Sequence, residues 1–130
     1  MADAWTKEEV VATVEAYFEM LALELDDRDF NKAEYNRNLR THLNNRTKAA
    51  VELKHQNISA VLDSLGLRFI NGYKPKGNYQ ALLRESVQAH LASYPGLQAK
   101  LKKPAEGSSG ISAPVVLLVG SLLATYALCG

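Results

Sequence analysis

The residues best suited to chemistry lie in one stretch, residues 53–80, where cationic and aromatic side chains follow a glycine stop signal. Lys74 and Lys76 occupy a loop beside two tyrosines, Tyr73 and Tyr79. Cations neutralise phosphates and flat rings stack on bases, so this composition is typical of a nucleic-acid surface. An ordinary solvated loop has the same composition, and Tyr79 fits a core position equally well because it precedes an amphipathic helix.

Four polar residues, Lys54, His55, Gln56 and Asn57, lie shortly before this loop. Gln and Asn pair bidentately with adenine, and Lys pairs with guanine or phosphate. The alternative is a structural role, in which Asn57 caps a helix. The surrounding segment has the pattern of a helix-turn-helix unit, but its second helix carries Asp63 and no arginine, which disfavours phosphate contact. If DNA is bound, we therefore expect a basic platform made of Arg37, Arg40, Arg46, Lys48, Lys54, His55, Gln56, Tyr73, Lys74 and Lys76.

Catalytic sequence motifs are absent. The chain has no GxxxxGK[ST] phosphate loop, no GxSxG elbow, no HExxH and no Cys-x-x-Cys. The three histidines, His42, His55 and His90, lie far apart in the sequence. We therefore expect no catalytic residue, no metal site and no cofactor.

The net charge of +1 hides a strong asymmetry. Residues 1–30 contain nine acidic and two basic residues, a net charge of −7, whereas residues 31–103 contain thirteen basic and four acidic residues, a net charge of +9. The basic region suits nucleic acid or an anionic lipid surface, unless the fold brings the two regions together. The one cysteine, Cys129, excludes an internal disulfide and a multi-cysteine zinc site. With no secretion-signal pattern after Met1, we expect an intracellular protein.

Helices must position these residues. Thr6 with Glu9 forms a capping-box pattern ahead of helical apolar spacing to about Leu25, and Asn31 with Glu34 repeats it. At 130 residues and 47% hydrophobic composition, the chain can form one core but not two. The predicted fold class is all-α, a small bundle of about five helices plus an apolar C-terminal tail helix. The expected helices cover about 6–25, 31–43, 47–55, 57–65 and 78–94.

Two further local features are predicted at helix starts. Asn78 is expected to cap the last bundle helix, which should stop near Tyr94 because Pro95 follows it. Trp5 is expected to act as a hydrophobic staple against Val10.

The composition changes after Lys100, where a polar linker leads into twenty residues without a charge, residues 111–130. Twenty helical residues span about 30 Å, the hydrocarbon thickness of a bilayer. The preceding lysines favour a cytoplasmic location for the domain. A membrane-spanning tail anchor, a buried packing helix and a tail made by a truncated or shifted reading frame all stay open.

We therefore divide the chain into a helical domain (1–100), a Gly/Ser linker (101–110) and an apolar tail (111–130). The expected location is the cytoplasm, with the tail as an anchor to the inner face of the plasma membrane if it spans the bilayer.

Three segments carry a family resemblance: WTKEEVVATVEAYFEML from Trp5, FNKAEYNRNL from Phe30 and VELKHQNISAVLDSLGLRFINGYKPKGNYQALL from Val51. They resemble the N-terminal head domain of McrA-type modification-dependent restriction endonucleases, a module that also heads other multidomain proteins. The similarity runs to about Leu91, and its most specific strings are KHQNISAVL and GYKP. In that family the head precedes domains that bind modified DNA and cut it, which this chain lacks. The resemblance implies a DNA-defence setting and an all-helical fold.

Two functions follow as hypotheses. The first is a non-catalytic head domain that contributes DNA contact or positioning, here without its nuclease. The second is a protein-interaction module that docks a partner through Glu15, Glu19 and Glu24 of the acidic first helix and is tethered to the membrane by residues 111–130. The expected partners are accordingly DNA, a nuclease module or other protein, and a membrane. A small enzyme is disfavoured by the missing motifs.

Overall fold

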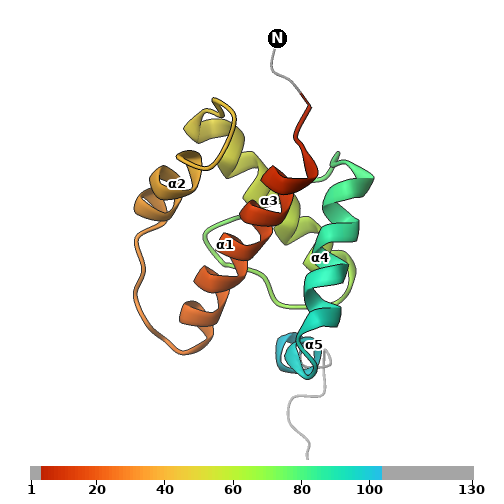
Figure 1. The fold of residues 1–130 in the computed structure, drawn as a ribbon. Helices are drawn as coiled ribbons and strands as arrows, with labels where there is room; N and C mark the ends of the chain where they lie inside the picture. The colour runs from red at the N-terminus through yellow and green to blue at the C-terminus, as the bar shows by residue number, and fades with distance from the viewer. Residues whose placement is uncertain (1–3, 104–130) are drawn as a thin grey trace, which may run out of the picture.

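The computed structural model describes residues 4–103, and the predicted tail, residues 111–130, lies outside them. The described residues form five helices and no strand, so the predicted all-α class is confirmed (Figure 1). Within residues 4–103, none of the helices combines the length and the apolar character needed to cross a bilayer. The helices are α1 (Lys7–Leu25), α2 (Lys32–Arg40), α3 (Lys48–Ser64), α4 (Ala81–Ser93) and α5 (Leu97–Leu101).

α1 and α2 begin where their capping patterns predict. The Thr6 hydroxyl accepts from the Glu9 N–H at 3.1 Å, and the Glu9 carboxylate accepts from the Thr6 N–H at 3.0 Å. Asn31 caps α2 by accepting from the Glu34 N–H at 3.0 Å. These bonds join residues three apart and satisfy backbone donors that a helix start leaves free. The local sequence is therefore enough to predict them.

The two helices predicted over 47–55 and 57–65 are one continuous helix, α3, so the helix-turn-helix interpretation is wrong. Asn57, the predicted cap of the second helix, lies within α3 and is almost fully buried. Its side-chain amide donates to the carbonyls of Lys76 and Gly77. The polar residues at this point bind a distant loop and do not break the helix.

The predicted Asn78 cap of α4 is also wrong. α4 begins two residues later than expected, after Gln80, whose side chain makes no capping bond. Asn78 instead has a left-handed backbone with φ of 61°, a conformation that asparagine tolerates better than most residues. The predicted stop at Tyr94 is confirmed.

The short helix α5 was not predicted. It follows Gly96, whose φ of 89° is strained for residues with a side chain. Leu101 at its end is fully buried, and Lys102 forms an isolated antiparallel bridge with Leu67. Packing therefore continues to the end of the described residues.

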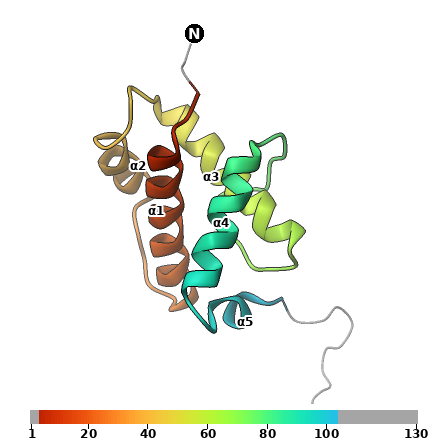
Figure 2. The ribbon, with the colours of Figure 1, turned by 45° about the vertical axis from the view of Figure 1, so that its right-hand side comes forward.

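α1 is the central element of the bundle. It lies between α2 and α4 in both views (Figures 1 and 2) and also packs against α3. One large apolar cluster joins α1, α3, α4 and α5, and a smaller cluster of Leu39, Leu43 and Val51 joins α2 to α3. Trp5 packs against both clusters.

A buried tyrosine fixes the long α3–α4 connection to the bundle. The Tyr17 hydroxyl on α1 lies 2.7 Å from the Ser59 hydroxyl on α3 and accepts from the Ile70 N–H at 2.9 Å. Burial raises the pKa of Tyr17, although these two hydrogen bonds oppose the shift. The connection that carries the predicted lysines is thus held at a defined place on α3.

Candidate nucleic-acid interface

Tyr73, predicted as a stacking residue, lies inside the bundle. Only 4% of its surface is exposed, and its ring centre lies 4.9 Å from that of His55. The Lys32 ammonium covers the ring at 4.8 Å from its centre. Burial, with a smaller contribution from Glu52, raises the pKa of Tyr73 to about 12. This tyrosine has no free face for a base, because the apolar interior of the bundle takes it.

Lys74 and Lys76, in contrast, are exposed. The Lys76 N–H donates to the Gln56 carbonyl on α3 at 3.1 Å. Together with the two bonds from Asn57, this contact ties the backbone of the loop to α3 while the lysine side chains stay in solvent. The backbone of the loop is therefore held on α3, and its two lysine side chains are exposed.

Lys54 lies on the same helix as Gln56 and is half-buried. Its ammonium lies 5.1 Å from the centre of the Trp5 ring and 3.4 Å from the Gln80 side-chain oxygen. Arg46 lies over the same ring at 4.8 Å. Burial and the charge of Arg46 lower the pKa of Lys54. The indole ring thus positions Lys54 by a cation–π contact and does not act only as the predicted staple.

Arg46 is not part of any surface platform, because it forms a buried ion pair with Glu9 of α1. The Arg46 guanidinium donates to the two Glu9 oxygens at 2.8 and 3.0 Å, and a further N–H of Asn44 donates to Glu9 at 2.8 Å. Both side chains are 3% exposed. The hydrogen bond from Arg46 lowers the pKa of Glu9 to about 2 against the opposing effect of burial. Arg46 therefore stabilises the start of α1.

His55 is also removed from the predicted surface, since it is fully buried on α3. Its ring centre lies 5.8 Å from that of Tyr17, and neither ring nitrogen makes a well-formed hydrogen bond to the described residues. Burial lowers its pKa to about 4, although the nearby Thr13 backbone favours the charged ring slightly. A neutral imidazole enclosed in this way is a core residue.

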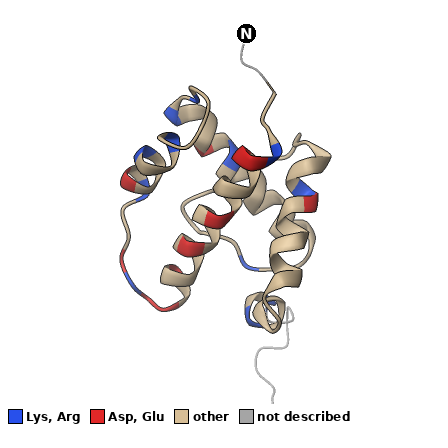
Figure 3. Cartoon of the chain, viewed as in Figure 1, with Lys and Arg blue, Asp and Glu red and all other residues tan. Residues whose placement is uncertain are grey.

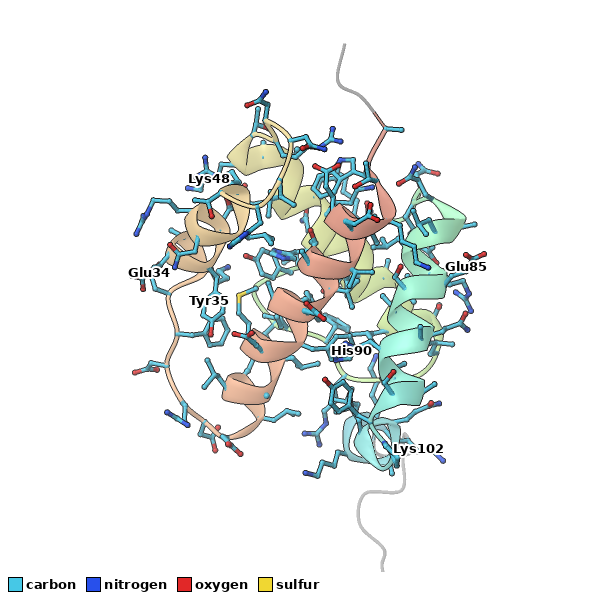
Figure 4. The ribbon with its side chains drawn as sticks, in the orientation of Figure 1. Glu34, Tyr35, Lys48, Glu85, His90 and Lys102 are labelled. Carbon is cyan, nitrogen blue, oxygen red and sulfur yellow. The ribbon has the colours of Figure 1, made fainter. Side chains whose placement is uncertain are left out.

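The half-buried Arg40 and the exposed Lys48 form a second group where α2 meets α3, and Figure 4 shows Lys48 at this edge of the molecule. The Arg40 Nε donates to the Asn36 side-chain oxygen at 2.7 Å, and the Asn36 amide donates to the Lys48 carbonyl at 3.2 Å. Arg37 lies nearby, 4.0 Å from the exposed carboxylate of Glu34. An exposed pair at that distance contributes little.

Five of the ten predicted residues are thus accessible cations with no carboxylate of residues 4–103 within 4 Å. Glu52, which is exposed, lies on α3 between Lys48 and Lys54 in sequence. Figure 3 shows acidic residues along α1 and in the connection to α2, and of these Glu9 is paired with Arg46 of the basic region. We name these five the basic band: Arg40, Lys48, Lys54, Lys74 and Lys76.

Asn36 and Gln80, which hold Arg40 and Lys54, were not predicted as site residues. Asn36 and Arg40 are four residues apart on α2, a spacing that places two side chains of a helix side by side, whereas Gln80 lies 26 residues after Lys54 and no short sequence pattern marks that pair. Residues 4–103 contain no group of three side chains arranged to hold a metal ion.

Comparison with known proteins adds no identity: no protein family, curated protein or solved structure matches this chain.

Proposed function

We propose that the helical domain binds DNA through phosphate contacts made by the basic band, as the non-catalytic head domain of a McrA-type restriction protein. The resemblance of its sequence to such heads supports the DNA-defence setting. The geometry supports a contact to the backbone of DNA, because the rings of Tyr73 and His55, which would read bases, are buried.

The observation that carries the proposal is the chemistry of the groups that hold these cations. Amide oxygens of Asn36 and Gln80 bind Arg40 and Lys54, and a backbone carbonyl on α3 holds the loop of Lys74 and Lys76. Neutral partners position a cation and leave its charge uncompensated. A set of such cations favours a polyanion, since each phosphate contact releases a counterion.

The test uses the full-length chain and a labelled 20-base-pair duplex of random sequence, with binding followed by fluorescence anisotropy from low to moderate salt. Lys74→Ala combined with Lys76→Ala should weaken binding equally for unrelated sequences. The slope of log K against log salt should fall by roughly 1.8 for two lost phosphate contacts. Lys100→Ala combined with Lys102→Ala, which removes the same charge from exposed positions at α5, is the matched control.

Equal affinities and salt slopes for the loop variant and the parent would remove Lys74 and Lys76 from the interface. Equal losses in the loop variant and the α5 control would reduce the effect to net charge and refute a localised band.

Protein docking is the second candidate, and the exposed apolar residue Tyr94 beside Glu15 favours it. Of the acidic residues predicted to dock a partner, Glu24 is used within the fold, where it accepts from the Asn71 N–H at 3.0 Å. A partner bound by apolar contact would keep its affinity over the same salt range, which separates this candidate from DNA binding.

A further inference from the structure

A long apolar trough runs along the seam between α1 and α4 and continues to α5. It consists of two adjoining hollows of about 380 and 660 Å³, which share His90 and Tyr94 among their lining residues. The upper hollow begins near Lys7, and the lower one ends at Leu101. Figure 4 shows His90 between α1 and α4.

Aromatic rings form the middle of this trough. The His90 ring stacks on Phe18 with 4.2 Å between ring centres and 13° between planes, and the Tyr94 ring centre lies 4.8 Å from that of His90. Burial lowers the pKa of His90, against a weaker opposing effect of Glu15. This middle section therefore presents neutral, flat surfaces.

The trough exposes apolar surface that the rest of the domain hides. Of the three large hydrophobic side chains exposed among residues 4–103, two line it, namely Tyr94 at 56% and Val11 at 37%. Its charged lining residues carry both signs, with Lys7 and Glu85 in the upper hollow. Mixed charges at the rim do not favour a charged ligand of either sign, so the expected occupant is uncharged and apolar.

The chain itself contains a segment of this chemistry, and the described residues end next to the trough. Lys103 follows Leu101 by two residues, and Leu101 lines the lower hollow. The seven residues 104–110 span at most roughly 25 Å. Along α1 the trough extends from Lys7 to Asp26, a rise of roughly 28 Å. Residues 111–130 follow and carry no charge.

We propose that residues 111–130 of this chain bind in the trough between α1, α4 and α5. A spacer of seven residues gives an effective concentration of roughly 1 mM, so even an intrinsic affinity of ~0.1 mM leaves the trough about 90% occupied. The apolar segment then covers Tyr94 and Val11. A membrane or the trough of a second copy competes for the same segment.

The test measures how fast a thiol in residues 111–130 reacts with a maleimide in the full-length chain, without detergent or lipid. Cys129 is the only natural cysteine and provides one probe, and Ser121→Cys in a Cys129→Ser chain provides a second. Light scattering during the same measurement gives the mass of the species. At least one thiol should react roughly tenfold more slowly than in urea, in a monomer.

Ala89→Glu places a charge in the trough at an exposed position, whereas Ala92→Glu places the same charge on α4 outside the lining residues. Ala89→Glu should raise the reaction rate of the protected thiol roughly tenfold, and Ala92→Glu should leave it unchanged.

Fast reaction at both positions in the parent chain would overturn the proposal, as would protection that Ala89→Glu does not relieve. Protection found only in a dimer would assign the segment to a second copy. A chain that needs detergent or vesicles to stay in solution, with labelling insensitive to Ala89→Glu, would assign it to a membrane. Each of these results excludes binding within one chain.

Discussion

Neutralising Glu9 is expected to destabilise the domain strongly at neutral pH and far less in acid. Glu9 accepts hydrogen bonds from Thr6, Asn44 and Arg46, and both charged side chains of the pair are buried. Glu9→Gln keeps the size of the side chain but removes the negative charge that faces Arg46 inside the fold. Breaking a buried ion pair in this way costs about 3–5 kcal/mol.

The pH dependence gives an independent value for the stability that the ionised Glu9 contributes. The pKa of Glu9 is lowered from 4.5 to about 2 in the folded state, which corresponds to about 3 kcal/mol of stability. A lowered carboxyl pKa stabilises the fold above the unfolded-state value of 4.5, and this stability is lost as the pH falls towards 2. The linkage relation gives a loss of about 2 kcal/mol by pH 3 in the parent. Glu9→Gln has no carboxylate to protonate and cannot lose this stability. The difference in free energy of unfolding between the parent and the variant should therefore shrink by that amount.

Urea unfolding of the full-length chain, followed by circular dichroism at pH 7 and pH 3, measures both quantities. Glu8→Gln is the matched control, because it removes the same charge from the same first turn at an exposed position, where the expected cost stays below about 1 kcal/mol. The reasoning is refuted if Glu9→Gln costs less than 1 kcal/mol at pH 7. It is equally refuted if the cost is the same at pH 7 and pH 3.

Two further outcomes test the residues that the structure moved from the predicted interface into the fold. The pKa of His55 is lowered from 6.5 to about 4, so its neutral form is favoured in the folded state and stability falls as the pH drops below 6.5. The free energy of unfolding of the parent, measured by urea unfolding, should fall by about 2 kcal/mol between pH 7 and pH 5, and His55→Leu should remove this loss. An unchanged loss in the variant would show that His55 is not its cause. Asn57→Ala should destabilise by about 1–2 kcal/mol, because two carbonyls lose their donor while alanine favours the helix. Faster hydrogen exchange at the Lys76 amide, with no change at the amides of α1, would place the effect in the loop, and uniform acceleration would argue against it.

The sequence by itself predicted the all-α class, the starts of α1 and α2 and the end of α4. Each depends on contacts within one turn of a helix or on a proline that cannot continue one. Thr6 needs only Glu9, and Tyr94 precedes Pro95, so no distant residue is involved.

Tertiary structure decided which polar residues are on the surface. The run from Lys54 to Asn57 was interpreted as a helix junction with DNA-reading side chains, but its partners are Trp5, Gln80, Lys76 and Gly77, all far away in sequence. These contacts form only when α1, α3 and the α3–α4 connection pack together. The same polar residue satisfies a buried carbonyl or faces solvent according to that packing, and local spacing holds no information about it.

The cations predicted for the interface differ in exposure for the same reason. Arg46 is buried in an ion pair with Glu9, 37 positions earlier, whereas Lys74 and Lys76 are exposed and the hydrogen bonds described here tie the backbone of their loop to α3. Burying a charge requires a charged partner in the folded structure. Amino-acid types thus determined that the chain forms a helical bundle with a basic region, and long-range pairing determined which of those charges a ligand can reach.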